Sequence, residues 1–155
     1  MKVLGFRSDP SAPRYALVTK TSEEFLLLNS STDSRLKFPA TIGDEDECGR
    51  ITWVYNEIAR VFDGHPEIAK VVIKINEYTR SDTKAKRRSS HIDAAVMLCC
   101  AQRNVPVTIR VYGNLATTSS DTLRHAEARV GRTLKYWDTK MADAVNAAWW
   151  GLQHK

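Results

Sequence analysis

The segment IAKVVIKINEY, residues 68–78, contains a nearly continuous run of β-branched residues that ends in a polar stretch. A run of this kind is typical of a strand whose two faces are both covered by other elements. Lys74 breaks the apolar pattern near the end of the run. The sequence therefore predicts a central strand over 68–75, and it raises the question of why a lysine stands near the carboxyl end of that strand.

Three short apolar-rich runs precede the central strand, at 2–8, 14–20 and 23–29, and turn-forming residues separate them. This arrangement predicts three strands of an antiparallel meander. A helix over about 45–63 is predicted next, because apolar residues recur there at helical spacing. The acidic residues 44–47 at its start are interpreted as favourable partners of the helix dipole rather than as metal ligands.

The residues after the central strand predict a polar loop at 79–88, a helix at 89–103, a strand at 106–112 and two helices at 119–131 and 139–152. The resulting order, βββαβαβαα, implies an α/β fold with a mixed five-stranded sheet flanked by helices. A chain of 155 residues is too short for two comfortable domains, so we expect a single domain that spans the whole chain.

The charge balance of 23 Lys+Arg against 18 Asp+Glu gives a net charge of +5, which favours polyanionic partners. No apolar run approaches the roughly 20 residues that a membrane-spanning helix needs, and the N-terminus lacks the apolar core of a signal peptide. We therefore expect a cytoplasmic protein without a membrane contact. Three cysteines without a paired spacing and four scattered histidines predict neither a disulfide framework nor a zinc site, so no cofactor is expected.

Three segments together resemble a known family: VLGFRSDPSAPRYALV at 3–18, KVVIKINEY at 70–78 with the basic stretch and helix behind it, and KMADAVNAAWW at 140–150. They are similar to the RuvC-type Holliday-junction resolvases, which are members of the RNase H-like fold. The resemblance covers nearly the whole chain in element order and implies an RNase H-like (RuvC-like) architecture. It also implies a nuclease ancestry, in which carboxylates hold Mg²⁺ ions against the scissile phosphate.

Most of the acids that this resemblance implies are replaced. Arg7 stands at the position of the first-strand acid, Lys74 at that of the central-strand glutamate, and only Asp143 remains of the acids on the final helix. At ~4 Å and an effective dielectric of about 20, a unit cation repels a divalent ion by roughly 8 kcal/mol before the solvent relaxes. We therefore expect no metal ion here. We expect Arg7 and Lys74 to converge on Asp143 and neutralise it, leaving one surplus positive charge.

A rebuilt metal site is the alternative. Asp9 lies two residues after Arg7 and shares its strand face, whereas Glu77, three residues after Lys74, faces the other way unless the strand has already ended. Together with Asp143, these two residues would form a carboxylate set for a Mg²⁺-dependent endonuclease.

Five cations gather within nine residues behind the central strand: Arg80, Lys84, Lys86, Arg87 and Arg88. The resemblance places this basic loop where the resolvases contact their DNA. We therefore expect these residues to bind nucleic-acid phosphates.

Three functions are open on this reasoning. The favoured one is a RuvC-like protein without catalytic activity that binds DNA or RNA, or a nucleic-acid-associated complex, through the basic loop and the charge-inverted site. The second is the Mg²⁺-dependent nuclease with relocated carboxylates. The third is a homodimeric or protein-binding scaffold, in which Trp150 on the final helix would be a contact residue if it is exposed.

Overall fold

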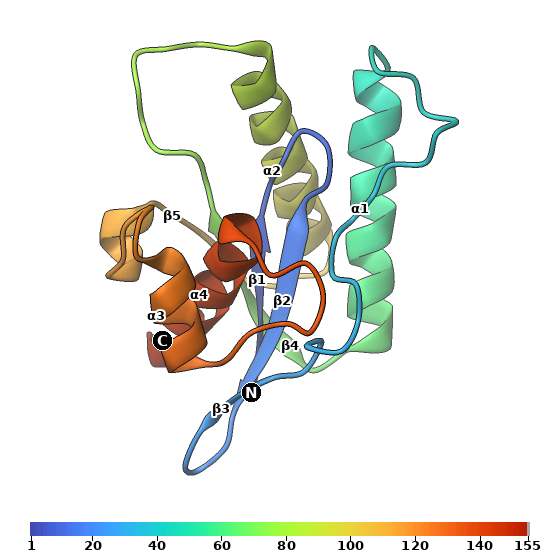
Figure 1. Ribbon diagram of the computed structural model, residues 1–155. Helices are drawn as coiled ribbons and strands as arrows, with labels where there is room; N and C mark the ends of the chain where they lie inside the picture. The colour runs from blue at the N-terminus through green and yellow to red at the C-terminus, as the bar shows by residue number, and fades with distance from the viewer. Residues whose placement is uncertain (155) are drawn as a thin grey trace.

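The predicted central strand lies next to the middle of a five-stranded sheet. The structure, a computed structural model, describes residues 1–154. In it β4 (Ile68–Lys74) runs parallel to β1 (Lys2–Arg7) on one side and to β5 (Val107–Arg110) on the other. The remaining strands, β2 (Arg14–Lys20) and β3 (Phe25–Leu27), continue from β1 in antiparallel pairing. The strand order is β3-β2-β1-β4-β5, which is the mixed sheet expected from the sequence (Figure 1).

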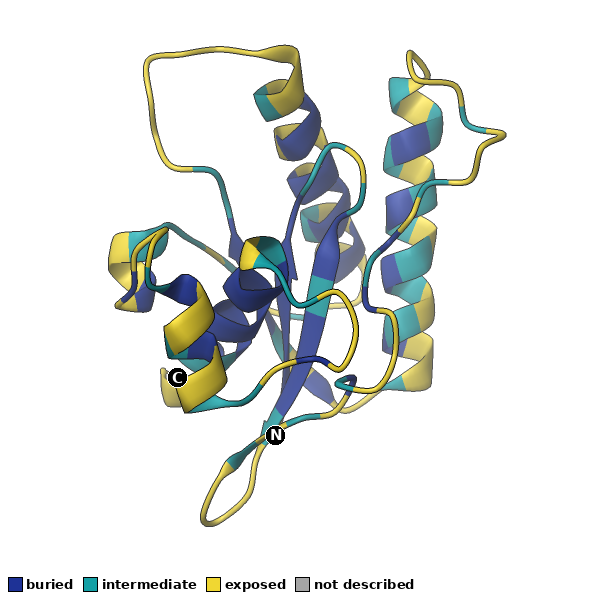
Figure 2. Cartoon of the chain, viewed as in Figure 1, coloured by how far each residue is buried: buried dark blue, intermediate teal, exposed yellow. Residues whose placement is uncertain are grey.

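The helices are α1 (Glu47–Gly64), α2 (Lys84–Gln102), α3 (Thr122–Arg129) and α4 (Thr139–Gln153), and a 3₁₀ helix (Tyr112–Leu115) follows β5. One face of the sheet is covered by α1 and α2, and the other by α4 with α3 beside it (Figure 1). Each face therefore has its own apolar core, and Figure 2 shows the inward sides of the helices buried and their outer sides exposed. Within residues 1–154, none of the helices combines the length and the apolar character needed to cross a membrane.

The approach of α4 to the sheet depends on Gly5 in β1. A Cβ atom at this position would overlap the backbone of Ala144 and would lie 2.6 Å from the amide nitrogen of Ala148. Neither backbone atom can move without the helix moving. The glycine therefore allows α4 to lie directly on β1 and brings the side chains of this helix to the ends of the central strands.

The predicted element order is confirmed, but the start of the second helix is not. Its first residue is Lys84 rather than residue 89, so the second half of the predicted basic loop is helical. Two physical causes act together here. The side chain of Thr83 caps the helix by accepting a hydrogen bond from the amide of Lys86 at 3.2 Å, and the lysines, arginines and alanine that follow are strong helix formers.

Candidate functional site

Arg7 and Lys74 end β1 and β4 and stand side by side, because they are partners in the parallel register. Side chains alternate along a strand, so both point to the face covered by α4, as Val3 and Val72 do on the same strands. The carboxyl ends of neighbouring parallel strands form the usual ligand-binding edge of an open α/β sheet. The two cations thus occupy the edge where a binding site is expected.

Asp143 projects from α4 onto Arg7 and is only 1% exposed. The Nε atom of Arg7 donates to its Oδ2 at 3.1 Å, the Tyr112 hydroxyl donates to the same oxygen at 3.0 Å, and the Thr122 hydroxyl donates to Oδ1 at 2.9 Å. Burial raises the pKa of Asp143, while the Arg7 guanidinium, the Thr122 hydroxyl, the Lys74 ammonium and the Tyr112 hydroxyl oppose that rise. The expected contact of Arg7 with Asp143 is present.

Lys74 does not bond to Asp143; it bonds to Glu77. Its Nζ atom lies 2.9 Å from Oε1 of Glu77, donates to the carbonyl of Ile75 at 2.6 Å and sits 3.8 Å from the centre of the Tyr112 ring. The ammonium is fully buried, and this burial lowers the pKa of Lys74 despite the nearby carboxylates. Burial acts to raise the pKa of Glu77, but the Tyr112 amide and the Lys74 ammonium hold it below its usual value.

The expectation of a surplus positive charge at this edge is therefore wrong. Arg7 and Lys74 face two carboxylates, Asp143 and Glu77, so the formal charges of these four groups cancel. The cause is the end of β4 at Lys74. Beyond that residue strand alternation no longer applies, and the chain turns so that Glu77 returns to the side of the lysine.

A third ion pair of the same kind flanks the site. Lys140, one helical turn before Asp143 on α4, has its Nζ atom 2.8 Å from Oδ2 of Asp9. The other Asp9 oxygen accepts hydrogen bonds from the amides of Ser11 and Ala12 at 2.8 and 2.9 Å, which closes the turn after β1. Asp9 is thus held by a lysine and a turn, and the strand no longer directs it toward Asp143.

This arrangement does not bring the three carboxylates of the rebuilt metal site together. Asp9, Glu77 and Asp143 each face their own cation, and within residues 1–154 no three His, Cys, Asp or Glu side chains lie close enough to hold one ion. Each of these carboxylates is paired with an ammonium or guanidinium group, which repels a divalent cation. The residues at this edge therefore do not fit the Mg²⁺ ions that the RNase H-like resemblance implies.

The predicted phosphate-binding residues fall into two groups. Arg80, Lys84 and Arg87 are exposed, and Lys86 is half-buried with its Nζ atom bound only by the oxygens of Thr79 and Ser81. Exposed ion pairs join Lys84 to Glu45 and Arg87 to Asp82. Such pairs are weak and screened by salt, so their cations remain available to phosphates.

Arg88 differs from its neighbours because it is buried. Its guanidinium bridges α2 to the start of α1, where it donates to Glu47 Oε1 at 2.7 and 2.9 Å and to Asp44 Oδ1 at 3.2 Å. The acidic residues at the start of α1 therefore serve a salt bridge as well as the helix dipole. Arg88 joins the two helices and does not face a ligand.

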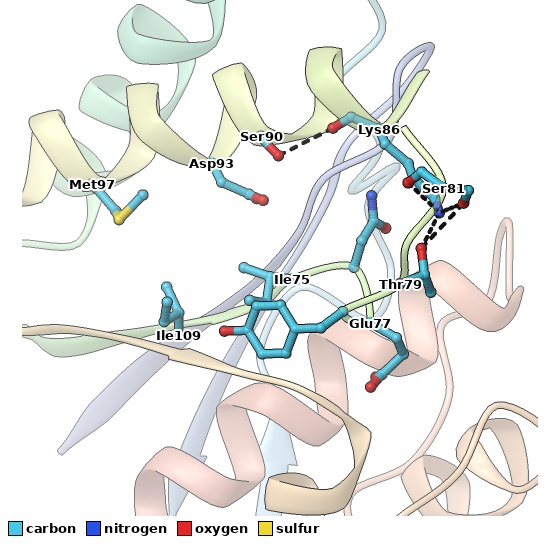
Figure 3. A pocket seen from close by; sticks show the side chains of 11 residues that line it. Ile75, Glu77, Thr79, Ser81, Lys86, Ser90, Asp93, Met97 and Ile109 are labelled. Atoms are coloured by element: carbon cyan, nitrogen blue, oxygen red, sulfur yellow. Dashed lines mark hydrogen bonds between the residues drawn. The ribbon is translucent and has the colours of Figure 1, made fainter. Parts of the chain in front are cut away.

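Two pockets open between the strand ends and the first turns of α2. The first, about 290 Å³, lies between Asp93 on α2 and the segment after β4, as Figure 3 shows. The second, about 400 Å³, extends toward Lys140. They share Asn76, Glu77, Thr79 and Lys86, so they form one continuous depression along the 76–79 segment.

Trp150 is half-buried rather than exposed, which weakens the argument for a protein-contact residue. Its ring stacks on His154 with the centroids 4.2 Å apart, and the guanidinium of Arg110 lies 4.2 Å from the ring centre on β5. The sheet edge thus brings the cation of Arg110 against this tryptophan, a contact that the sequence of the final helix does not indicate.

Sequence reasoning missed the residues that hold Asp143 in place. Thr122 donates to Asp143 and is itself held by Asn146, whose Nδ2 donates to the Thr122 hydroxyl and carbonyl at 3.0 Å each. Arg129 completes the chain by donating to Asn146 Oδ1 at 3.0 Å. One signal was available, since Asn146 lies three residues after Asp143 and hence on the same helix face.

Comparison with known proteins shows the fold. Neither a protein-family model nor a curated protein sequence matches this chain. The structure of Thermus thermophilus RuvC in complex with a Holliday junction substrate is similar, with 15% identity, a TM-score of 0.77, and 97% of this chain and 92% of that chain covered. A second Thermus thermophilus RuvC structure gives 14% identity, a TM-score of 0.75 and the same coverage.

The yeast mitochondrial Holliday junction resolvase Ydc2 is also similar, with 10% identity, a TM-score of 0.56, and 98% of this chain and 80% of that chain covered. The chain therefore has the RuvC-like variant of the RNase H fold, as the sequence resemblance implied.

Proposed function

We propose that this protein binds nucleic acid along the depression beside the 76–79 segment and does not cleave it by metal-dependent hydrolysis. The observation that best supports this proposal is the set of three ion pairs at the strand ends, Arg7–Asp143, Lys74–Glu77 and Lys140–Asp9. They leave no free carboxylate set for metal ions while keeping cations along the edge of the sheet.

The charge distribution supports a polyanionic ligand. Lys140 lines the second pocket, Lys86 lines both pockets where they meet, and the exposed Arg80, Lys84 and Arg87 lie on the adjoining loop and helix start. Several cations along one groove favour a ligand with repeated negative charges, because each phosphate contact releases a counterion. The fold supports the same proposal, since one similar structure holds a Holliday junction substrate.

An exposed aromatic residue supports nucleic acid over other polyanions. Tyr78 is 80% exposed and lines the first pocket, two residues before Arg80. An aromatic ring beside cations offers a stacking surface to a base while the phosphates are bound next to it. A simple polyphosphate has no group that would use this ring.

Salt-dependent binding to labelled DNA and RNA tests the proposal. Fluorescence anisotropy with single strands, duplexes and four-way junctions should give affinities that fall steeply with salt. Charge reversal in the double variant Lys86→Glu/Arg87→Glu should weaken binding to all of these ligands and reduce the salt slope by about 2. Arg60→Glu on α1 is the matched control, because Arg60 is also exposed and is also paired with an acid, Glu57.

Other outcomes identify the alternatives. Absence of binding to every nucleic acid at low salt would overturn the proposal and favour a protein-interaction scaffold. Analytical ultracentrifugation would then measure the oligomeric state of that scaffold. Cleavage of a labelled junction that requires Mg²⁺ and is abolished by Asp143→Asn would overturn the absence of catalysis. Binding without cleavage is the expected result.

A further inference from the structure

Apolar side chains line part of the first pocket. Met97 projects into it from α2, and Ile75 and Ile109 border it from the ends of the sheet (Figure 3). Tyr78 stands at the border of the same pocket with most of its side chain exposed. Apolar walls with a few convergent polar groups are typical of sites for small organic groups.

The inner end of this pocket contains a buried acid that the ion pairs do not satisfy. Asp93 is 5% exposed, lines the pocket, and its Oδ1 atom has no hydrogen-bond partner among residues 1–154. Arg7 and Lys74, whose charges act on Asp93, are bonded to Asp143 and Glu77 instead. Ser8 is the neutral side chain that stabilises the Asp93 carboxylate, and burial outweighs its effect. A buried carboxyl group with so little support is costly to the fold, so its presence beside a pocket favours a role in binding.

Lys86 is the cation in the lining of the pocket, and the carboxylate of Glu77, which also lines it, is paired with Lys74. The Nζ atom of Lys86 is held toward the 79–81 segment by the oxygens of Thr79 and Ser81 (Figure 3). A cationic peptide side chain would meet this ammonium before it could reach Asp93. A ligand with an anionic group at the mouth and N–H donors at the inner end matches both charges.

From these features, and resting on the nucleic-acid binding proposed above, we propose that the pocket receives one unstacked nucleobase of the bound strand. Asp93 accepts a hydrogen bond from an amino or imino N–H on the base edge, and Met97, Ile75 and Ile109 contact the faces of the ring. Lys86 binds the phosphate of the same nucleotide. Tyr78 stacks on the base or on its neighbour at the mouth.

Free nucleosides test the pocket independently of phosphate binding. Two-dimensional amide NMR spectra of the protein, titrated with each common nucleoside to millimolar concentration, should show shifts confined to residues 75–78 and to the α2 residues around Asp93. Ribose phosphate, which carries no base, is the control and should leave the residues around Asp93 unshifted.

Two variants separate the pocket from the rest of the surface. Asp93→Leu keeps the side-chain size but removes the acceptor, and should weaken nucleoside binding about tenfold, the effect of one hydrogen bond. Ser90→Trp, at an exposed pocket-lining position, should fill the pocket and abolish nucleoside binding, whereas Ser90→Ala should not. The same spectra verify that each variant is folded.

The outcomes distinguish this inference from the proposed function. If oligonucleotides bind with a steep salt slope but no nucleoside shifts the pocket residues, the pocket assignment is overturned and nucleic-acid binding stands. Nucleoside shifts that persist unchanged in Asp93→Leu and Ser90→Trp also overturn it. If nucleosides bind at the pocket but no oligonucleotide binds, the base site stands and the proposed function fails.

Discussion

The Nε atom of Arg7, on the first strand, lies 3.1 Å from Oδ2 of Asp143, on the last helix. This contact connects the first strand to the last helix at the edge of the sheet. It is an attraction between two side chains of opposite charge. The charge pattern of the site is therefore stable without an ion.

Removing the cation of this pair should destabilise the fold. Arg7→Met leaves Asp143 buried without its partner, and we expect a loss of about 3–5 kcal/mol in the free energy of unfolding. The double variant Arg7→Met/Asp143→Leu should recover most of that loss, because neither charge remains. Urea denaturation of the single and double variants measures both values. A cost below about 1 kcal/mol for Arg7→Met would show that water already solvates the carboxylate.

Adjacent arginines on α2 should respond differently to truncation. Arg88→Ala removes a guanidinium that is 9% exposed and bound to Glu47 and Asp44, so we expect a loss of roughly 1–3 kcal/mol in stability. Arg87→Ala removes a side chain that is 71% exposed, and should change stability by less than about 0.5 kcal/mol. Thermal unfolding of the two variants makes the comparison. Equal losses would contradict the division of the basic segment into structural and ligand-facing residues.

A methyl group at Gly5 should disturb the packing of α4. Gly5→Ala places a Cβ atom against the backbone of Ala144 and Ala148, so we expect a loss of at least about 2 kcal/mol in the free energy of unfolding. Gly64→Ala is the matched control, because a Cβ atom there has no neighbour within 4 Å, and it should change stability by less than about 1 kcal/mol. Chemical denaturation checks both. If Gly5→Ala left the free energy of unfolding unchanged, α4 would be able to move away from β1 without loss of stability.

The stability of the protein should depend on pH through Asp93. Burial raises the pKa of this carboxyl group from 3.8 to about 7, against the opposing influence of Ser8, Arg7 and Lys74. Because the folded state then holds a proton that the unfolded state releases, the contribution of Asp93 to stability is complete below pH 3.8 and is lost as pH rises to about 7.

The isosteric variant Asp93→Asn isolates this dependence. It should be more stable than the natural protein by an amount that grows from pH 4 to pH 7 and then stays constant, on the order of 2–4 kcal/mol. Urea denaturation at several pH values gives the curve. A difference that does not vary with pH would contradict a proton on Asp93 in the folded state.

The sequence by itself determined the order of the elements and the identity of the cations at the site. The β-branched run of β4 and the helical spacing of apolar residues report burial directly, because each element must cover its own apolar face. The same patterns placed Arg7 and Lys74 near strand ends, and the resemblance to the RuvC-type resolvases assigned them to the site. These are local properties of the chain, and a single sequence carries them.

Only the tertiary structure decided which acid meets which cation. Glu77 reaches Lys74 because β4 ends at that lysine and pairing with β5 stops, which strand alternation along one segment does not predict. Thr122 and Tyr112 reach Asp143 from elements far along the chain, and the packing of α4 on Gly5 sets their distances. A contact between distant residues depends on how layers pack, so its partners are fixed by the assembled fold and not by any one stretch of sequence.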